Sequence, residues 1–136
     1  MKNKVIVLAA DHNGVELKKR LHEHLQNNGY ICVDLGPYTN NKSVDYTDYA
    51  SQLAQIVHKG DVERGILICG TGVGMSIAAN RFKNVRAALV HNLETAPKCR
   101  EHNNSNVLCL GSWITSDSAA TEICDTWLGT SFGEGR

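Results

Sequence analysis

The sequence lacks the features that mark several common functional classes. Basic residues are not in excess, because 14 lysines and arginines face 14 aspartates and glutamates and the isoelectric point is about 7.0. This balance argues against a nucleic-acid-binding surface and against a polybasic membrane patch. Long apolar runs are also missing. The run Val5–Ala10 is too short for a signal-peptide core or a membrane span.

Paired metal-binding cysteines are absent as well. The five cysteines are Cys32, Cys69, Cys99, Cys109 and Cys124. An odd number without a CxxC pair argues against a disulfide framework and a structural zinc site, and favours the reducing cytoplasm. His12, His91 and His102 fall on separate predicted elements, so we expect no metal site. At 136 residues the chain is expected to form one domain, residues 1–136, with a substantial core.

What the sequence does contain is an alternation of short apolar segments with amphipathic ones. The expected strands are Val5–Ala10, Tyr30–Leu35, Gly65–Cys69, Val85–Val90 and Asn106–Leu110. The expected helices are Val15–Gln26, Tyr46–Lys59, one beginning near Val73, Leu93–Glu101 and Ser116–Leu128. The alternation predicts an α/β fold with a doubly wound, parallel, five-stranded sheet. With strand order 2-1-3-4-5, strands one and three would be neighbours at the switch point, where ligands bind.

A glycine loop follows the third strand, with the sequence Gly70-Thr71-Gly72-Val73-Gly74. Glycines at alternate positions let backbone N–H groups approach an anion, and the start of the next helix adds further donors. The loop lacks both the G-x-G-x-x-G pattern of dinucleotide sites and the Gly-Lys-Ser/Thr ending of triphosphate sites. Cys69 precedes the loop, and Asp11 and His12 would face it. Cys69 is therefore either a packed strand-end thiol or an active-site residue.

A second polar cluster, Arg100–Asn106, lies between the fourth helix and the fifth strand. It should stand at the N-terminal edge of the sheet, opposite the crevice. One interpretation is an ordinary helix end, where basic residues and asparagine are favoured. The other is that the cluster acts in trans, in the crevice of a partner subunit. Arg136 has the same two interpretations: a solvated tail residue or an anion clamp for a neighbour.

These segments together resemble a known family. The matching segments are Asp11–Gly14, Asp45–Tyr46, Gly65–Asn80, Arg100–Val107 and Gly133–Arg136. They are similar to the ribose-5-phosphate isomerase B family, which includes galactose-6-phosphate isomerase subunits and allose-6-phosphate isomerases. The resemblance runs over essentially the whole chain. It implies the 2-1-3-4-5 fold and a homodimer, sometimes paired into tetramers, with shared active sites and the tail, residues 129–136, docked on the partner.

The resemblance also implies roles for individual residues. Cys69 would be the base that moves a proton between C1 and C2 of the sugar, with Thr71 beside the reacting oxygens. Backbone N–H groups of Gly70, Gly72, Val73 and Gly74 would surround the enediolate. Asp11 and His12 would contact the substrate from the same subunit as Cys69. His102 and Asn103 would reach it from the partner subunit, and Arg136 is also expected to contact it. In that scheme His102 opens the furanose ring, Asn103 holds sugar hydroxyls and Arg136 binds phosphate. Neither a cofactor nor a metal is required.

Two positions depart from the family pattern. Family members commonly carry a phosphate-binding arginine shortly after the fifth strand, where this sequence has Trp113. They also commonly continue past Arg136 to a second arginine. The Trp113 ring either narrows the site or stacks on a sugar, or else packs a dimer interface. The expected activity is interconversion of ribose 5-phosphate and ribulose 5-phosphate. The alternatives are a six-carbon sugar phosphate, allose 6-phosphate or galactose 6-phosphate, and a non-catalytic sugar-phosphate-binding subunit.

Overall fold

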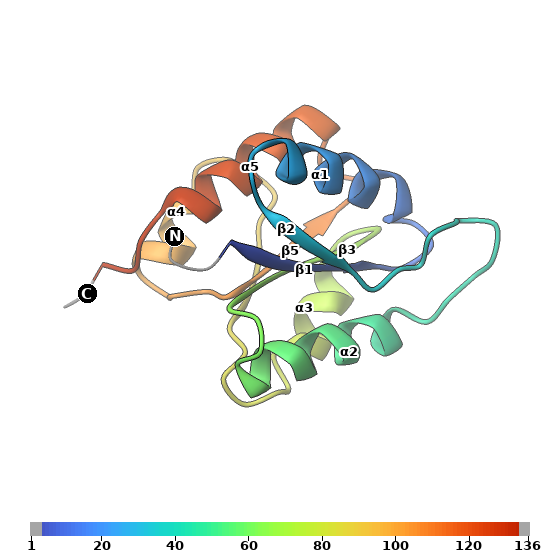
Figure 1. Cartoon of the computed structure of the whole chain (residues 1–136), viewed down its shortest axis with the longest axis horizontal. Coiled ribbons are helices and arrows are strands. Elements are labelled where there is room, and N and C mark those ends of the chain that lie inside the picture. The colour runs from blue at the N-terminus through green and yellow to red at the C-terminus, as the bar shows by residue number, and fades with distance from the viewer. Residues whose placement is uncertain (1–3, 134–136) are drawn as a thin grey trace.

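The structure is a computed structural model and describes residues 4–133. Five parallel strands form one sheet with a helix following each strand (Figure 1). The strands are β1 (Val5–Ala10), β2 (Ile31–Asp34), β3 (Arg64–Cys69), β4 (Ala87–Leu89) and β5 (Val107–Gly111). The helices are α1 (Val15–Asn27), α2 (Tyr46–Lys59), α3 (Val73–Ala79), α4 (Thr95–Glu101) and α5 (Asp117–Gly129). All ten predicted elements are present, which confirms the α/β doubly wound class.

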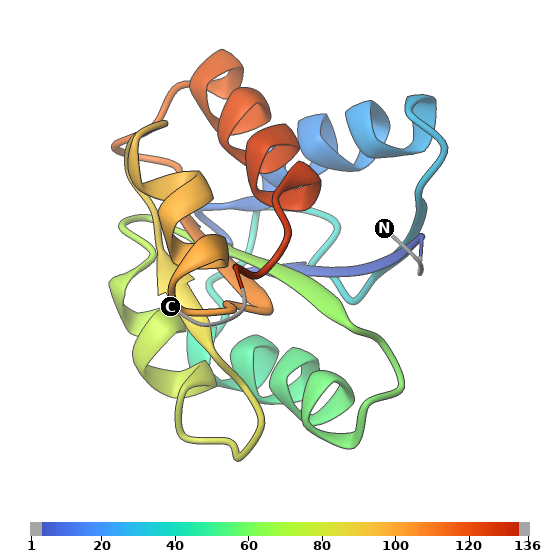
Figure 2. The same cartoon turned by 90° about the vertical axis from the view of Figure 1, so that its left-hand side faces the viewer.

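The helices cover both faces of the sheet. Helices α1, α4 and α5 lie on one face and α2 and α3 on the other (Figure 2). Each face has its own buried cluster, because alternate residues of a strand point to opposite sides. In β1, Ile6 and Leu8 contribute to the first cluster, whereas Val7 and Ala9 contribute to the second. The central strands are therefore apolar throughout, as the sequence predicts for a parallel sheet covered on both sides.

The predicted strand order is wrong in its last two positions. The observed order is β2-β1-β3-β5-β4, so β5 lies next to β3 and β4 forms the edge. The reason is burial: all five residues of β5 are buried, whereas the three of β4 are half-buried or exposed. A short, partly exposed strand is better suited to an edge than a fully apolar one. The correction matters for the site, because it places the residues after β5 directly beside Cys69.

Within residues 4–133 no helix is long and apolar enough to cross a membrane. No group of three His, Cys, Asp or Glu side chains in the same residues is arranged to hold a metal ion.

Candidate active site

The C-terminal ends of β1, β3 and β5 meet at one edge of the sheet. The Asp11 N–H, just past β1, donates to the carbonyl of Ile68 at 3.0 Å. Beyond β5, the Ser112 N–H donates to the carbonyl of Cys69 at 2.9 Å, and its hydroxyl donates to the carbonyl of Asn13 at 2.8 Å. The prediction that the first and third strands are neighbours is therefore confirmed, and Asp11 follows β1 beside the end of β3. Ser112 links all three strand ends, a role the sequence alone did not indicate.

Cys69 is the last residue of β3, and its side chain turns into the glycine loop. The residue is 6% exposed, and its Sγ accepts a hydrogen bond from the Gly72 N–H at 3.1 Å. Gly72 can make this approach because its φ is 83°, a left-handed conformation that favours glycine. A Cβ there would also lie 3.0 Å from the carbonyl of Leu110. The loop is thus folded around the thiol with a polarised donor on the sulfur.

Thr71 is held by the loop and by the next segment of the chain. Its Oγ1 accepts a hydrogen bond from the Val73 N–H at 3.2 Å, and its carbonyl accepts one from Nε2 of His91 at 2.9 Å. Because a carbonyl only accepts, Nε2 of His91 carries the proton. Gly111 allows the close approach of β5, since a Cβ there would lie 2.6 Å from the Thr71 carbonyl oxygen. From the sequence, His91 was considered only as one of three histidines on separate elements, and not as a residue of this site.

Asp11 and His12 stand beside this loop at the end of β1. Asp11 is buried, 7% exposed, and its Oδ1 accepts the Asn13 N–H at 2.9 Å. His12 is half-buried, and its Nδ1 accepts the Val44 N–H at 3.2 Å. The proton of the neutral imidazole therefore lies on Nε2, which is available as a donor. The site thus combines a carboxylate, an imidazole and a thiol.

Two aromatic rings lie on the loop glycines. The ring of Trp113 packs on Gly70, where a Cβ would lie 2.7 Å from the ring. The backbone N–H of Trp113 also donates to the Gly70 carbonyl at 2.9 Å. On the other side, the Tyr46 ring lies 2.7 Å from the Cβ position of Gly74. Trp113 nevertheless remains 70% exposed. Both glycines are required because aromatic rings occupy the space of a side chain.

The other four cysteines are placed differently. Burial raises the pKa of Cys32 to about 11, with a further contribution from Asp34. Burial also raises the pKa of Cys99, Cys109 and Cys124 above that of a free thiol. These four thiols stay protonated near neutral pH and belong to the packing of the fold. None of them lies at the glycine loop.

His102 and Asn103 lie at the opposite edge of the sheet, as the sequence predicts. They follow α4 and precede β5, so the five residues of β5, at about 3.3 Å each, put roughly 16 Å between them and the Cys69 end. Both side chains are exposed and make no hydrogen bond to a described residue. Arg100 is buried and is used internally, donating to the carbonyls of Thr130 and Ser105. Its guanidinium is therefore engaged within its own chain.

The predicted tail is described only in part. Residues 130–133 pack on α4 of the same chain, with the Gly133 N–H donating to the Glu101 carbonyl at 3.1 Å. Arg136 lies outside the described residues. Its predicted role, and the docking of the tail on a partner, stay predictions.

The fold is that of a doubly wound α/β protein, in which a carboxylate and an imidazole follow one strand and a thiol with a glycine loop ends the neighbouring strand. The chain belongs to the Ribose/Galactose Isomerase family, whose model it matches over residues 6–136, and it is an isomerase. It is 43% identical over 133 residues to the Escherichia coli ribose-5-phosphate isomerase B, covering 98% of this chain and 89% of that protein.

Solved structures agree with this assignment. The Clostridium thermocellum ribose-5-phosphate isomerase B superposes with a TM-score of 0.94 at 42% identity, over 97% of this chain and 88% of the other. The Mycoplasma genitalium ribose-5-phosphate isomerase B, solved with bound ribulose-5-phosphate, gives 0.93 at 47% identity, over 97% and 88%.

Proposed function

We propose that this protein interconverts ribose 5-phosphate and ribulose 5-phosphate. The observation that carries the proposal is the thiol of Cys69, held at the end of β3 with the Gly72 N–H on its sulfur. Aldose–ketose isomerisation needs a base near C2 and fixed donors where an oxyanion develops. The relative solved with ribulose-5-phosphate, 47% identical to this chain, supports the five-carbon substrate.

In the proposed reaction, Cys69 acts as a thiolate and removes the proton from C2 of the open-chain aldose. The electrons of the C–H bond form the C1=C2 double bond of an enediolate, and the negative charge moves to O1. The S–H proton exchanges with water, the thiol then gives a proton to C1, and O2 becomes the ketone oxygen as its proton passes to O1. A hydrogen bond from a backbone N–H favours the thiolate over the thiol.

The loop donors divide between the thiol and the substrate. The Gly72 N–H is used by Cys69, and the Val73 N–H by the hydroxyl of Thr71. We propose that the other loop N–H groups, those of Gly70, Thr71 and Gly74, donate to the enediolate. The Thr71 hydroxyl accepts from Val73, so its own proton is free to be donated to a reacting oxygen. Loss of one such donor typically lowers the rate by about 10²–10³-fold.

The ring-opening acid is proposed to come from a second subunit. Roughly 16 Å along β5 separates His102 and Asn103 from the Cys69 end of their own chain. We infer a homodimer, in some assemblies paired into tetramers, in which His102 and Asn103 of one subunit complete the site of the other. His12 and Asp11 contact the sugar from the first subunit, and Arg136 binds its phosphate.

A six-carbon substrate is the second candidate, and Trp113 is the observation that favours it. An exposed indole lies on Gly70, where family members commonly have an arginine for phosphate. Substrate preference follows from the ratio of kcat/KM values. We would compare ribose 5-phosphate, allose 6-phosphate and galactose 6-phosphate, with wild type and Cys69→Ala. We expect ribose 5-phosphate to be preferred and Cys69→Ala to be inactive on all three. Preference for a six-carbon sugar phosphate would make that sugar the substrate in place of ribose 5-phosphate. Binding without turnover would make the chain a non-catalytic subunit.

The expected compartment is the cytoplasm. The five cysteines are free. Free thiols are typical of proteins that work in a reducing environment.

A further inference from the structure

The turn that carries His102 and Asn103 is clamped to the start of the edge strand. The Nε–H of Arg86 donates to the carbonyl of Asn103 at 2.6 Å. The backbone N–H of Arg86 donates to Oδ1 of Asn106 at 2.8 Å, and its carbonyl accepts the Asn106 N–H at 2.9 Å. Nδ2 of Asn106 donates to the carbonyl of Asn84 at 2.8 Å. Four hydrogen bonds thus join residues 84–86 to residues 103–106.

The turn needs this support because its own conformation is unusual. Asn104 has a φ of 49°, in the left-handed region, where α4 ends. Its N–H donates to the Arg100 carbonyl at 3.1 Å. This bond fixes Asn104 from the helix side. Arg86 holds the preceding carbonyl, that of Asn103, from the sheet side. Exposed side chains at a helix end are otherwise free to move.

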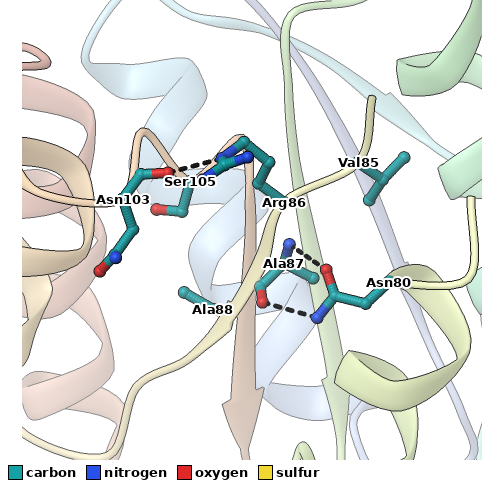
Figure 3. Close-up of a pocket in the computed structure, with 7 residues that line it drawn as sticks. All are labelled: Asn80, Val85, Arg86, Ala87, Ala88, Asn103 and Ser105. Atoms are coloured by element: carbon teal, nitrogen blue, oxygen red, sulfur yellow. Dashed lines mark hydrogen bonds between the residues drawn. The ribbon is translucent and has the colours of Figure 1, made fainter. Parts of the chain in front are cut away.

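Figure 3 shows how Arg86 approaches the turn. Its guanidinium reaches toward Asn103 and Ser105, beside a cavity of about 400 Å³ at the edge of the sheet. On the other side of the cavity, the carboxamide of Asn80 pairs with both the N–H and the carbonyl of Ala87, at 2.8 and 2.9 Å. Asn80 thereby fixes the strand from which Arg86 extends. Among the described residues, no carboxylate forms a salt bridge with Arg86, so its contact in the fold is this carbonyl.

We infer that Arg86 is a positioning residue: it fixes the turn from which His102 and Asn103 enter the site of the partner subunit. This inference rests on the shared-site isomerase proposed above. Arg86 acts in the subunit that supplies His102, never in the subunit that supplies Cys69. Removing the clamp displaces the ring-opening acid. A misplacement of about 1 Å at a catalytic group can lower the rate by about 10²-fold.

The test is subunit complementation with Arg86→Met. Mixed with Cys69→Ala, it should give active heterodimers, because one site then combines an intact Cys69 with an intact Arg86 and His102. Mixed with His102→Ala, it should give none above the level of Arg86→Met itself, because every site lacks either His102 or its clamp. The Arg86→Met homodimer should lose about 10- to 10²-fold in kcat. The matched control is Arg81→Met, which removes an exposed arginine whose side chain has no partner among the described residues and should leave the rate unchanged.

The outcomes separate this inference from the function it rests on. The reference pair is Cys69→Ala with His102→Ala, with subunit exchange proven by mass spectrometry. If that pair fails to complement, the shared site itself is wrong. If the reference pair complements but Arg86→Met keeps the wild-type rate, only the role of Arg86 is wrong. The same conclusion follows if Arg86→Met restores activity when mixed with His102→Ala instead of with Cys69→Ala. Should Arg86→Met not fold, Arg86→Lys, which keeps the charge but lacks the Nε–H that donates to the Asn103 carbonyl, should show the same pattern.

Discussion

At the scale of residues, what sets Cys69 apart is its surroundings. Four of the five thiols lie in the core or beside an acidic residue, where burial raises their pKa. Cys69 is buried as well, but its sulfur accepts a backbone hydrogen bond at the start of a glycine loop. The sequence predicted both possibilities for this residue, a packed thiol and a reactive one. Only the folded loop, with the Gly72 N–H on the sulfur, favours the second.

A first prediction concerns thiol alkylation. With limiting iodoacetamide at pH 7, we expect Cys69 to be labelled before Cys32, although Cys32 is the more exposed of the two. A pKa of about 11 leaves only about one Cys32 side chain in 10⁴ as thiolate at that pH. Peptide mass spectrometry would follow the labelling, and ribose 5-phosphate should protect Cys69. Faster labelling of Cys32 would contradict the proposed thiolate.

A second prediction concerns Trp113, whose two interpretations give different results. If its exposed ring stacks on the substrate, Trp113→Ala should raise KM by about 5- to 10-fold, or about 1 kcal/mol, with kcat little changed. Ribose 5-phosphate should also change the fluorescence of the wild type but not of Trp113→Phe. The other tryptophan, Trp127, is fully buried and serves as an internal reference. Unchanged KM and fluorescence would assign Trp113 to subunit packing.

At the scale of elements, the sheet edge brings the site together. The alternation of apolar and amphipathic segments was enough to predict all ten elements, because the spacing of apolar residues and the positions of glycines can be read from short stretches of sequence. The order of β5 and β4 could not be predicted in this way, because it depends on which of these two short apolar strands is buried next to β3 and which forms the edge. The pairing of β5 with β3, which are far apart in the sequence, places Ser112 and Trp113 beside Cys69. These residues were therefore missed, or left without a role, by reasoning from the sequence.

A third prediction tests the contact between β5 and the loop. A Cβ at Gly111 would lie 2.6 Å from the Thr71 carbonyl oxygen, which is backbone and cannot move without shifting the loop. We expect Gly111→Ala to lower kcat by at least about 10²-fold, as loss of one oxyanion donor does. The control is Gly129→Ala, where no atom lies within 4 Å of the added Cβ. Equal activity of the two variants would show that the loop tolerates displacement.

At the scale of the whole molecule, the buried thiols couple stability to pH. Burial raises the folded-state pKa of Cys109 and Cys124 above the value of about 8.5 expected in the unfolded chain. The unfolded chain therefore ionises first as pH rises. The contribution of these thiols is fully present below about pH 8.5 and is lost progressively above it, by up to about 1.4 kcal/mol per pH unit for each thiol.

The fourth prediction follows from this sign. In urea unfolding at pH 7.5 and pH 10, the free energy of unfolding should fall more for the wild type than for Cys124→Ala, which lacks one ionisable thiol. The comparison cancels the titration of lysines and tyrosines, which both proteins share. If the free energy of unfolding falls by the same amount in both proteins, the ionisation of Cys124 does not contribute to the pH dependence, and the prediction is contradicted.

The most direct test of the proposed function is isomerisation in D₂O, followed by ¹H NMR. If Cys69 moves the proton through an enediolate, ribulose 5-phosphate should acquire deuterium at C1, and recovered ribose 5-phosphate should acquire it at C2. Cys69→Ala should lose both exchange and isomerisation, while circular dichroism confirms that it folds. Turnover without deuterium incorporation, or exchange that persists in Cys69→Ala, would contradict proton transfer by this thiol.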